Sequence, residues 1–135
     1  MVEMTGIYLG DKRCESTHGP SGSKLSTDAP KDNAGKGEAF SPTDLVGVSL
    51  ATCILTTMAI VAERDGVDLR GSTFRVNKEM SANPRKIERL TVSLKLPAKI
   101  DPEYRKKMEH VAHTCPVHRS LHPDVQLPIT FDWVL

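Results

Sequence analysis

The residues around two cysteines, Cys53 and Cys115, indicate how reactive their thiols are. Cys53 lies in the apolar run SLATCILTTMAIVAERDG, at a position that alanine or leucine could fill equally well. Cys115 lies in HTCPVHRSLHPD, directly before Pro116 and close to three histidines and Arg119. The thiolate is the nucleophilic form of cysteine, and basic neighbours favour it. We therefore expect Cys115 to be partly exposed and activated, whereas Cys53 taken alone is better explained as a small core residue.

The histidines near Cys115 leave two other kinds of site open. A metal site would draw on zinc-type ligands at close spacing: His110, His113, Cys115, His118 and His122. Pro116 interrupts this run, and the chain has no CxxC pair and no HExxH helix, so scattered surface histidines explain it better. A nucleophilic Cys115–His118 pair is the second possibility, but spacing around a proline fixes no geometry.

Composition limits the class of protein. The 135 residues are 39% hydrophobic and 26% charged, which is typical of a single soluble domain, residues 1–135. The net charge of +1 gives no reason to expect nucleic acid or an anionic membrane as a partner, and we see no apolar run long enough to span a bilayer. The start, MVEMTGIYLG, does not resemble a secretion signal, and the three widely spaced cysteines are not a disulfide framework. We expect a cytoplasmic protein.

A long helix is predicted to carry Cys53. Ser41 fits the N-cap, Pro42 fits the first helical position, and Asp44 places an acid in the first turn. The helix should extend to about Arg64, because Gly66 follows as a stop signal. Its first half is apolar almost all round, so we expect burial on every side, by a sheet on one face and a second subunit on the other.

The remaining elements predict the fold class. Alternating or β-like runs predict strands near 7–9, 24–27, 74–80, 92–96 and 125–133. Asp101-Pro102 starts a second helix, and Cys115 lies at its C-terminal end, on the apolar stripe that Tyr104, Met108 and Val111 begin. Residues 31–40 are polar and glycine-rich, as in a loop. Runs of strands without strict strand–helix alternation predict an α+β fold with an antiparallel sheet.

Two motifs in this chain resemble those of the OsmC/Ohr family. In that family the central helix begins with Ser/Asn-Pro-x-acid and then reaches a cysteine after two small residues. Ser41-Pro42-Thr43-Asp44 and Ala51-Thr52-Cys53 match this pattern within GEAFSPTDLVGVSLATC. The second motif is a Cys-Pro-Val segment after a later helix, which Cys115-Pro116-Val117 matches. The order and separation of the motifs agree with the family, and the similarity in element order extends over nearly the whole chain.

The resemblance implies an OsmC-like fold with antiparallel sheets around a long buried central helix. It implies an intertwined homodimer with two active sites at the subunit interface. It also implies a thiol-dependent peroxidase that reduces organic hydroperoxides to alcohols without a metal, haem or other cofactor. Cys53 would be the peroxidatic cysteine, oxidised to a sulfenic acid, and Cys115 would resolve it as a Cys53–Cys115 disulfide. An external small or protein dithiol would then reduce the pair.

The family also uses an arginine from the N-terminal region as the cation beside the peroxidatic thiolate. Arg13 is the only arginine before the long helix, so the resemblance points to it, although an exposed surface arginine would look the same. In organic hydroperoxide reductases a glutamate follows the helix-starting proline and pairs with that arginine. Thr43 stands at this position here. Asp44 and Glu38 are the nearest acids that could replace it, and Asp44 is explained equally well as a helix-dipole acid.

Two functions of different classes therefore remain. The first is a peroxidase for organic hydroperoxides that uses Cys53, Cys115, Arg13 and Asp44. The alternative, which Thr43 keeps open, is a non-catalytic OsmC-like dimer that binds a small ligand or a partner in the interface pocket. The sequence assigns no role to Cys14.

Overall fold

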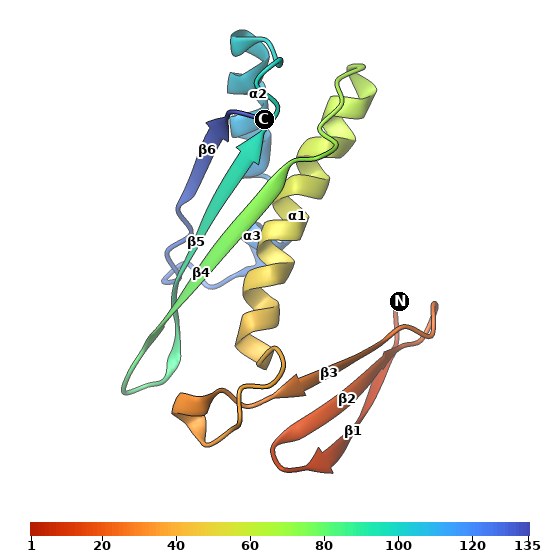
Figure 1. Cartoon of the computed structure of the whole chain (residues 1–135), viewed down its shortest axis with the longest axis vertical. Coiled ribbons are helices and arrows are strands. Elements are labelled where there is room, and N and C mark those ends of the chain that lie inside the picture. Colours follow the sequence, from red (N-terminus) through yellow and green to blue (C-terminus); the bar gives the residue numbers. More distant parts are fainter. The chain divides into compact units, whose positions relative to one another are not determined.

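The chain forms two compact units, and each carries one β sheet. The computed structural model describes all 135 residues, which divide into Met1–Val46 and Gly47–Leu135. Figure 1 shows the elements in sequence colours. Helix α1 (Pro42–Arg64) begins in the first unit and continues into the second, with the bounds that its capping residues predicted. The predicted α+β class is confirmed. A single domain over residues 1–135 stays a prediction.

The N-terminal unit is an antiparallel sheet of three strands in sequence order. The strands are β1 (Met4–Gly10), β2 (Arg13–His18) and β3 (Lys24–Asp28), followed by the short 3₁₀ helix η1 (Lys31–Asn33). Asp11 and Lys12 adopt positive φ between β1 and β2, as a tight hairpin turn requires. Large apolar side chains of this sheet remain exposed: Met4, Ile7, Tyr8, Leu9 and Leu25. The unit therefore lacks a closed core of its own.

The C-terminal unit contains a second sheet, with the order β4-β5-β6. Its strands are β4 (Thr73–Ser81), β5 (Lys86–Leu96) and β6 (Ile129–Trp133). β4 and β5 pair antiparallel, but β6 pairs parallel with β5, which differs from the expected all-antiparallel sheet. The reason is the connection: helices α2 (Pro102–Ala112) and α3 (Pro116–Ser120) form a crossover that returns the chain in the same direction.

Helix α1 packs one face on this sheet. A β carbon added to Gly47 would lie 3.5 Å from side-chain atoms of both Leu90 and Val76, so the helix approaches β4 and β5 closely there. The buried α1 residues of this unit recur at intervals of three or four, apart from the adjacent pair Leu50 and Ala51: Gly47, Leu50, Ala51, Ile54, Met58 and Ala62. On β5 the alternate residues Leu90, Val92, Leu94 and Leu96 are buried, as expected for a strand with one covered face. These two surfaces form the core.

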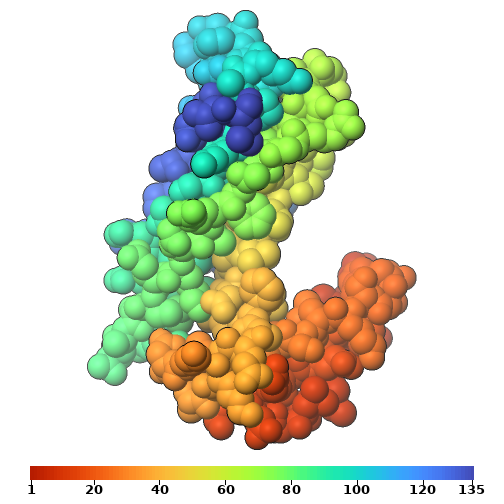
Figure 2. Space-filling view, viewed as in Figure 1, coloured from red at the N-terminus to blue at the C-terminus, as the bar shows by residue number.

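The opposite face of α1 is not buried within this chain. Ile60 is 48% exposed, and Figure 2 shows α1 atoms uncovered beside the β4 strand. The expectation of burial on every side is therefore met on one side only. By length and composition alone α1 could also cross a membrane, but core helices of soluble proteins meet the same criterion, so this is weak support for a span.

Candidate active site

The structure brings Cys53 and Cys115 together in the C-terminal unit. Cys53 lies in α1 and is half-buried, whereas Cys115 is fully buried. The Cys53 side chain lies close enough to Cys115 to help raise the pKa of its thiol, and both cysteines are free thiols. Two thiols in such proximity need only a small movement to form a disulfide. Of the candidate residues, these two are the cysteines that the structure brings into proximity.

Cys115 is held by the start of α3. Pro116 disfavours helical geometry at the residue before it, and Cys115 accordingly has extended backbone angles, φ −64° and ψ 143°. It serves as the N-cap of α3, because its Sγ accepts a hydrogen bond from the His118 backbone N–H at 3.2 Å. The sequence predicted that Pro116 would break the helix here but did not predict α3. The break and the cap together aim the thiol inward.

Two expectations about Cys115 were wrong. The side chain is buried and not partly exposed: Met108 and Ala112 of α2 are fully buried, and Cys115, three residues beyond the end of α2, is buried with them. Burial raises the pKa of the Cys115 thiol above its usual value, the backbone N–H groups of His118 and Val117 act in the opposite direction, and the neighbouring Cys53 raises it further. Desolvation is thus the largest effect on the pKa of this thiol, and the groups that oppose it are backbone N–H groups and not the basic side chains on which the expectation rested.

The histidines do not form a metal-binding group. His113 and His118 meet edge to face with ring centroids 5.6 Å apart, and no three His, Cys, Asp or Glu side chains are arranged to hold an ion. Burial, followed by the charge of His113, lowers the pKa of His118. The hydrogen bond that His118 gives Cys115 comes from its backbone, not from its ring. The ring thus has no observed role as a base for this thiol.

Arg13 lies in the N-terminal unit, paired with Glu38. Its Nη1 is 3.0 Å from Glu38 Oε2, and the two side chains are 32% and 57% exposed. Arg13 starts β2, opposite Asp28 at the end of β3. Among the acids that could replace the family glutamate, Glu38 is the one that the structure places against Arg13.

A buried carboxylate fixes the backbone next to Glu38. Asp28 Oδ2 accepts the Glu38 backbone N–H at 3.0 Å, and Asp28 is fully buried. This hydrogen bond is the main reason that the pKa of Asp28 is lowered; burial opposes it and the charge of Arg13 adds to it. Gly35 is required in the same loop, since a β carbon there would clash with the Ala29 carbonyl oxygen. Sequence reasoning missed Asp28, because a charged residue at a strand end gives no local sign of burial.

Asp44 participates in a capping box at the start of α1. The Ser41 backbone N–H donates to Asp44 Oδ2 at 2.8 Å, and the Asp44 backbone N–H donates to Ser41 Oγ at 3.1 Å. This reciprocal pair satisfies two backbone donors at the helix N-terminus. Thr43 Oγ1 lies 3.2 Å from Ser41 Oγ, so the residue at the family glutamate position also contacts the cap.

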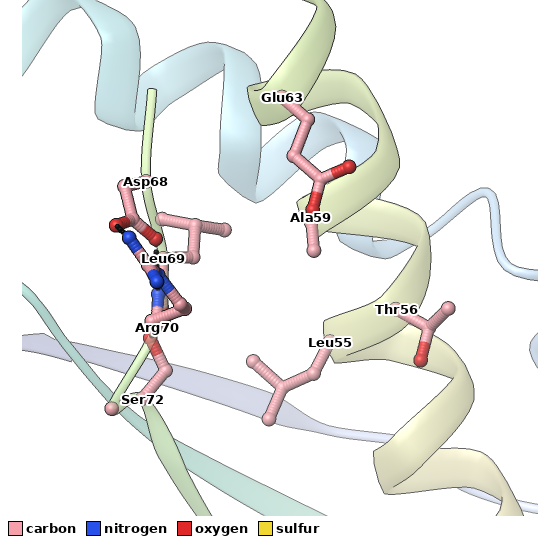
Figure 3. Close-up of a pocket in the computed structure, with 9 residues that line it drawn as sticks. Leu55, Thr56, Ala59, Glu63, Asp68, Leu69, Arg70 and Ser72 are labelled. Carbon is pink, nitrogen blue, oxygen red and sulfur yellow. Dashed lines mark hydrogen bonds and ion pairs between the residues drawn. The ribbon is translucent and has the colours of Figure 1, made fainter. Parts of the chain in front are cut away.

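Two hollows lie in the separate units. A groove of about 730 Å³ in the N-terminal unit is lined mainly by β1–β3 and includes Cys14, which pairs in register with Tyr8 and Thr27. A smaller pocket of about 270 Å³ in the C-terminal unit lies between α1 and the segment before β4, where Arg70 pairs with Asp68 across from Glu63 (Figure 3). None of the four candidate catalytic residues lines either hollow.

Comparisons with known proteins agree with this architecture. Residues 35–130 match the family described as OsmC-like protein. A solved structure from Psychrobacter arcticus, named for osmotic stress induction and a detoxification response, is 40% identical, covers 97% of this chain and 96% of its own, and has a TM-score of 0.92. No curated protein matches the sequence.

More distant structures share the fold. An OsmC-like protein from Mycoplasma pneumoniae is 17% identical, with a TM-score of 0.77 and coverage of 98% of this chain and 97% of its own. An organic hydroperoxide resistance protein OsmC from Legionella pneumophila is 19% identical, with a TM-score of 0.73 and coverage of 98% and 96%. The family match spans more than half of the chain, and the 40% identical structure covers nearly all of it, so the two together establish the family. The chain belongs to the OsmC-like family.

Proposed function

We propose that the protein is a thiol-dependent peroxidase that reduces organic hydroperoxides to alcohols. Family membership and the relatives named for organic hydroperoxide resistance support hydroperoxide-related redox chemistry. The observation that carries the proposal is the contact between Cys53 and Cys115, one half-buried and the other fully buried.

The reaction divides into three balanced steps. The Cys53 thiolate attacks the terminal oxygen of R–O–O–H, the O–O bond breaks, and R–O⁻ takes up a proton and leaves as the alcohol. Cys115, as a thiolate, then attacks the sulfenic sulfur of Cys53; the S–O bond breaks and hydroxide leaves as water. An external dithiol reduces the resulting disulfide and is itself oxidised. The sum converts one hydroperoxide and one dithiol into one alcohol, one water and one disulfide, with no cofactor.

The difference in burial supports the assignment of roles. The peroxidatic sulfur must meet a substrate from solution, and Cys53 is the more accessible of the two thiols. The resolving sulfur needs only to meet its partner, which a fully buried Cys115 already does. The raised pKa of Cys115 also keeps its proton in place until the first step is complete.

We assign Arg13 as the cation for the Cys53 thiolate, with Glu38 as its orienting acid. The support is the 3.0 Å ion pair, which gives Arg13 the carboxylate partner that Thr43 cannot supply. Asp44 is assigned to the start of α1 through its capping box, where a carboxylate also stabilises the positive end of the helix dipole.

We also propose that the working form is a cytoplasmic homodimer. The exposed apolar side chains of β1 and β3, together with Ile60 on α1, form surfaces that a second copy would cover. A reducing compartment suits a catalytic pair of free thiols that must be reduced in every cycle.

Replacement of the proposed nucleophile tests the function directly. Purified wild-type protein should consume tert-butyl hydroperoxide when a dithiol is supplied, and Cys53→Ser should consume none above background. Cys14→Ser is the matched control, since Cys14 lies in the other unit, and should behave as wild type. Unchanged turnover in Cys53→Ser would overturn the mechanism.

The non-catalytic alternative has one observation in its favour. The groove of about 730 Å³ in the N-terminal unit is large enough for a small ligand and does not include Cys53. A wild-type protein that leaves Cys53 unoxidised by peroxide at neutral pH, yet binds a small apolar probe, would support this function instead.

A further inference from the structure

The segments that contain α1 and α2 meet at two separated points, each involving a residue just beyond the end of one helix. At one point Cys53 of α1 meets Cys115, which follows α2. At the other, Asp65 follows the last residue of α1 and accepts two hydrogen bonds from the first turns of α2. Tyr104 Oη donates at 2.8 Å and Lys107 Nζ at 2.6 Å. We call these three residues, Asp65, Tyr104 and Lys107, the polar clamp.

The spacing of the two points is similar along both segments. Asp65 lies twelve residues after Cys53, directly beyond the end of α1, and Cys115 lies eleven residues after Tyr104, three beyond the end of α2. The contacts pair the start of one segment with the end of the other, so the two segments run in opposite directions. If Asp65 faces Tyr104, Cys115 is therefore brought opposite Cys53. A slip of one residue, about 1.5 Å along the axis, would misplace the sulfur pair.

Other polar contacts of α2 do not join it to α1: Glu109 Oε1 accepts a hydrogen bond from Trp133 Nε1 at 3.1 Å, and Arg105 lies over the Trp133 ring, so both connect α2 to β6. Met108 and Ala112 are the fully buried α2 residues between the two points. Methionine is flexible and adapts to irregular gaps, and alanine is too small to interlock. Directional hydrogen bonds to a carboxylate are shorter and more specific than such contacts.

We infer that Asp65 is a positioning residue: its hydrogen bonds to Tyr104 and Lys107 fix α2 against α1 and thereby hold Cys115 against Cys53. The effect of Asp65 on catalysis rests on the proposed function, in which it would influence the attack of Cys115 on the Cys53 sulfenic acid. It would leave the attack of Cys53 on peroxide untouched.

The charge states of the polar clamp persist over a broad pH range. The hydrogen bonds from Lys107 and then Tyr104 lower the pKa of Asp65. Burial, with the Asp65 hydrogen bond adding to it, raises the pKa of Tyr104 to about 12. Asp65 therefore stays ionised and Tyr104 stays protonated at any pH near neutral.

Adjacent lysines give a matched pair of variants. Lys107 bonds Asp65 across the two helices, whereas Lys106 bonds Glu103 on its own helix at 3.1 Å, with side chains 74% and 83% exposed. Lys107→Ala removes a bond of the polar clamp. Lys106→Ala removes the same charge from the same helix and should have no effect.

The first measurement needs no peroxide. Each variant is equilibrated in glutathione redox buffers, where the Cys53–Cys115 dithiol plus oxidised glutathione gives the disulfide plus two reduced glutathiones. Asp65→Ala should lower the equilibrium constant for disulfide formation about three- to tenfold. Lys107→Ala and Tyr104→Phe should lower this constant less. Asp65→Asn keeps an acceptor for Tyr104 and should fall between wild type and Asp65→Ala.

Stability separates positioning from a general structural effect. A merely structural role would lower the Tm of the reduced and the disulfide forms equally, whereas loss of register destabilises the disulfide form more. If all variants of the polar clamp have the same equilibrium constant for disulfide formation as wild type, the inference is wrong. If Asp65→Ala does not fold, Tyr104→Phe, which loses one hydroxyl, decides the question in the same way.

A peroxide experiment then distinguishes this inference from the proposed function. Asp65→Ala should form the Cys53 sulfenic acid at the wild-type rate but convert it to disulfide more slowly, as measured by trapping with a sulfenic-acid reagent. Wild-type protein that forms no sulfenic acid would contradict the proposed function, while the glutathione result would still decide the role of Asp65.

Discussion

The Cys53–Cys115 thiol pair and the Arg13–Glu38 ion pair are built in opposite ways. The thiols belong to the core side of the C-terminal unit, where Cys115 has no exposed surface and desolvation is the largest effect on its pKa. The ion pair belongs to the N-terminal unit and leaves 32% of the Arg13 side chain and 57% of the Glu38 side chain exposed. Core packing orients the first pair, whereas one loop and the buried Asp28 orient the second.

This difference bears on how each pair can contribute to catalysis. A buried thiol is insensitive to salt and is placed by the fold itself. An exposed ion pair contributes little until water is excluded from it, because solvent screens its charges. The comparison suggests that the redox pair is complete within one chain and that the ion pair gains strength only when its surface is covered. Four predictions test this contrast.

The largest effect is expected from loss of the resolving thiol. In Cys115→Ser the first equivalent of hydroperoxide should still oxidise Cys53, but sustained turnover with a dithiol should fall about 100-fold, since the intramolecular partner is gone. Mass spectrometry should find Cys53 as sulfenic and then sulfinic acid. A Cys14–Cys53 disulfide in this variant would instead show that the N-terminal unit supplies a thiol.

The pH dependence of disulfide formation should reveal the buried thiol. Because burial raises the pKa of Cys115, only a small fraction of this thiol is thiolate at neutral pH. As long as the pH is below that pKa, this fraction increases about tenfold for each unit by which the pH rises. The rate of conversion from sulfenic acid to disulfide should therefore rise steeply from about pH 6 to about pH 8. Acid quenching and alkylation of free thiols would measure it. A rate independent of pH would mean that the thiol is activated in some other way.

Loss of the ion pair should have a smaller effect that depends on salt. Arg13→Gln should slow oxidation of Cys53 about tenfold at low ionic strength, and Glu38→Gln should slow it less. High salt should reduce the difference from wild type, because exposed charges are screened. Arg70→Gln, which removes an arginine paired with Asp68 in the other unit, is the control. If Arg70→Gln and Arg13→Gln slow the reaction equally, the effect is one of net charge.

The smallest effect is expected at the cap of α1. Ser41→Ala removes the side-chain acceptor of the Asp44 backbone N–H and should lower the free energy of unfolding by about 1 kcal/mol. The rate of Cys53 oxidation should not change. Ser26→Ala, at an exposed position of β3, is the control for stability in urea. A loss of activity in Ser41→Ala would show that the cap also shapes the site.

Local signals predicted the elements that carry the thiols. The bounds of α1 follow from Ser41, Pro42 and Gly66, because caps and stop residues act within a few positions. The start of α2 at Pro102 follows in the same way, with Asp101 as its N-cap. Such features do not depend on the rest of the chain, so the sequence alone is sufficient for them.

Features that depend on distant parts of the chain could not be predicted from the residues alone. The burial of Cys115, which is the largest effect on the pKa of its thiol, depends on how the segment after α2 packs in the core. The choice of Glu38 over Asp44 as the Arg13 partner depends on how the loop after β3 folds back. The parallel direction of β6 depends on the crossover through α2 and α3. Only the family resemblance linked Cys53 to Cys115 in advance.

The crossover also determines when during folding the two thiols can meet. β6 can pair with β5 only after α2 and α3 have brought the chain back along the sheet, and such non-local pairing forms slowly. The α2–α3 segment carries Cys115, so its contact with Cys53 belongs to the same late event. The contact between Cys53 and Cys115 is therefore expected only in the fully folded chain. A nascent or partly unfolded chain would lack it.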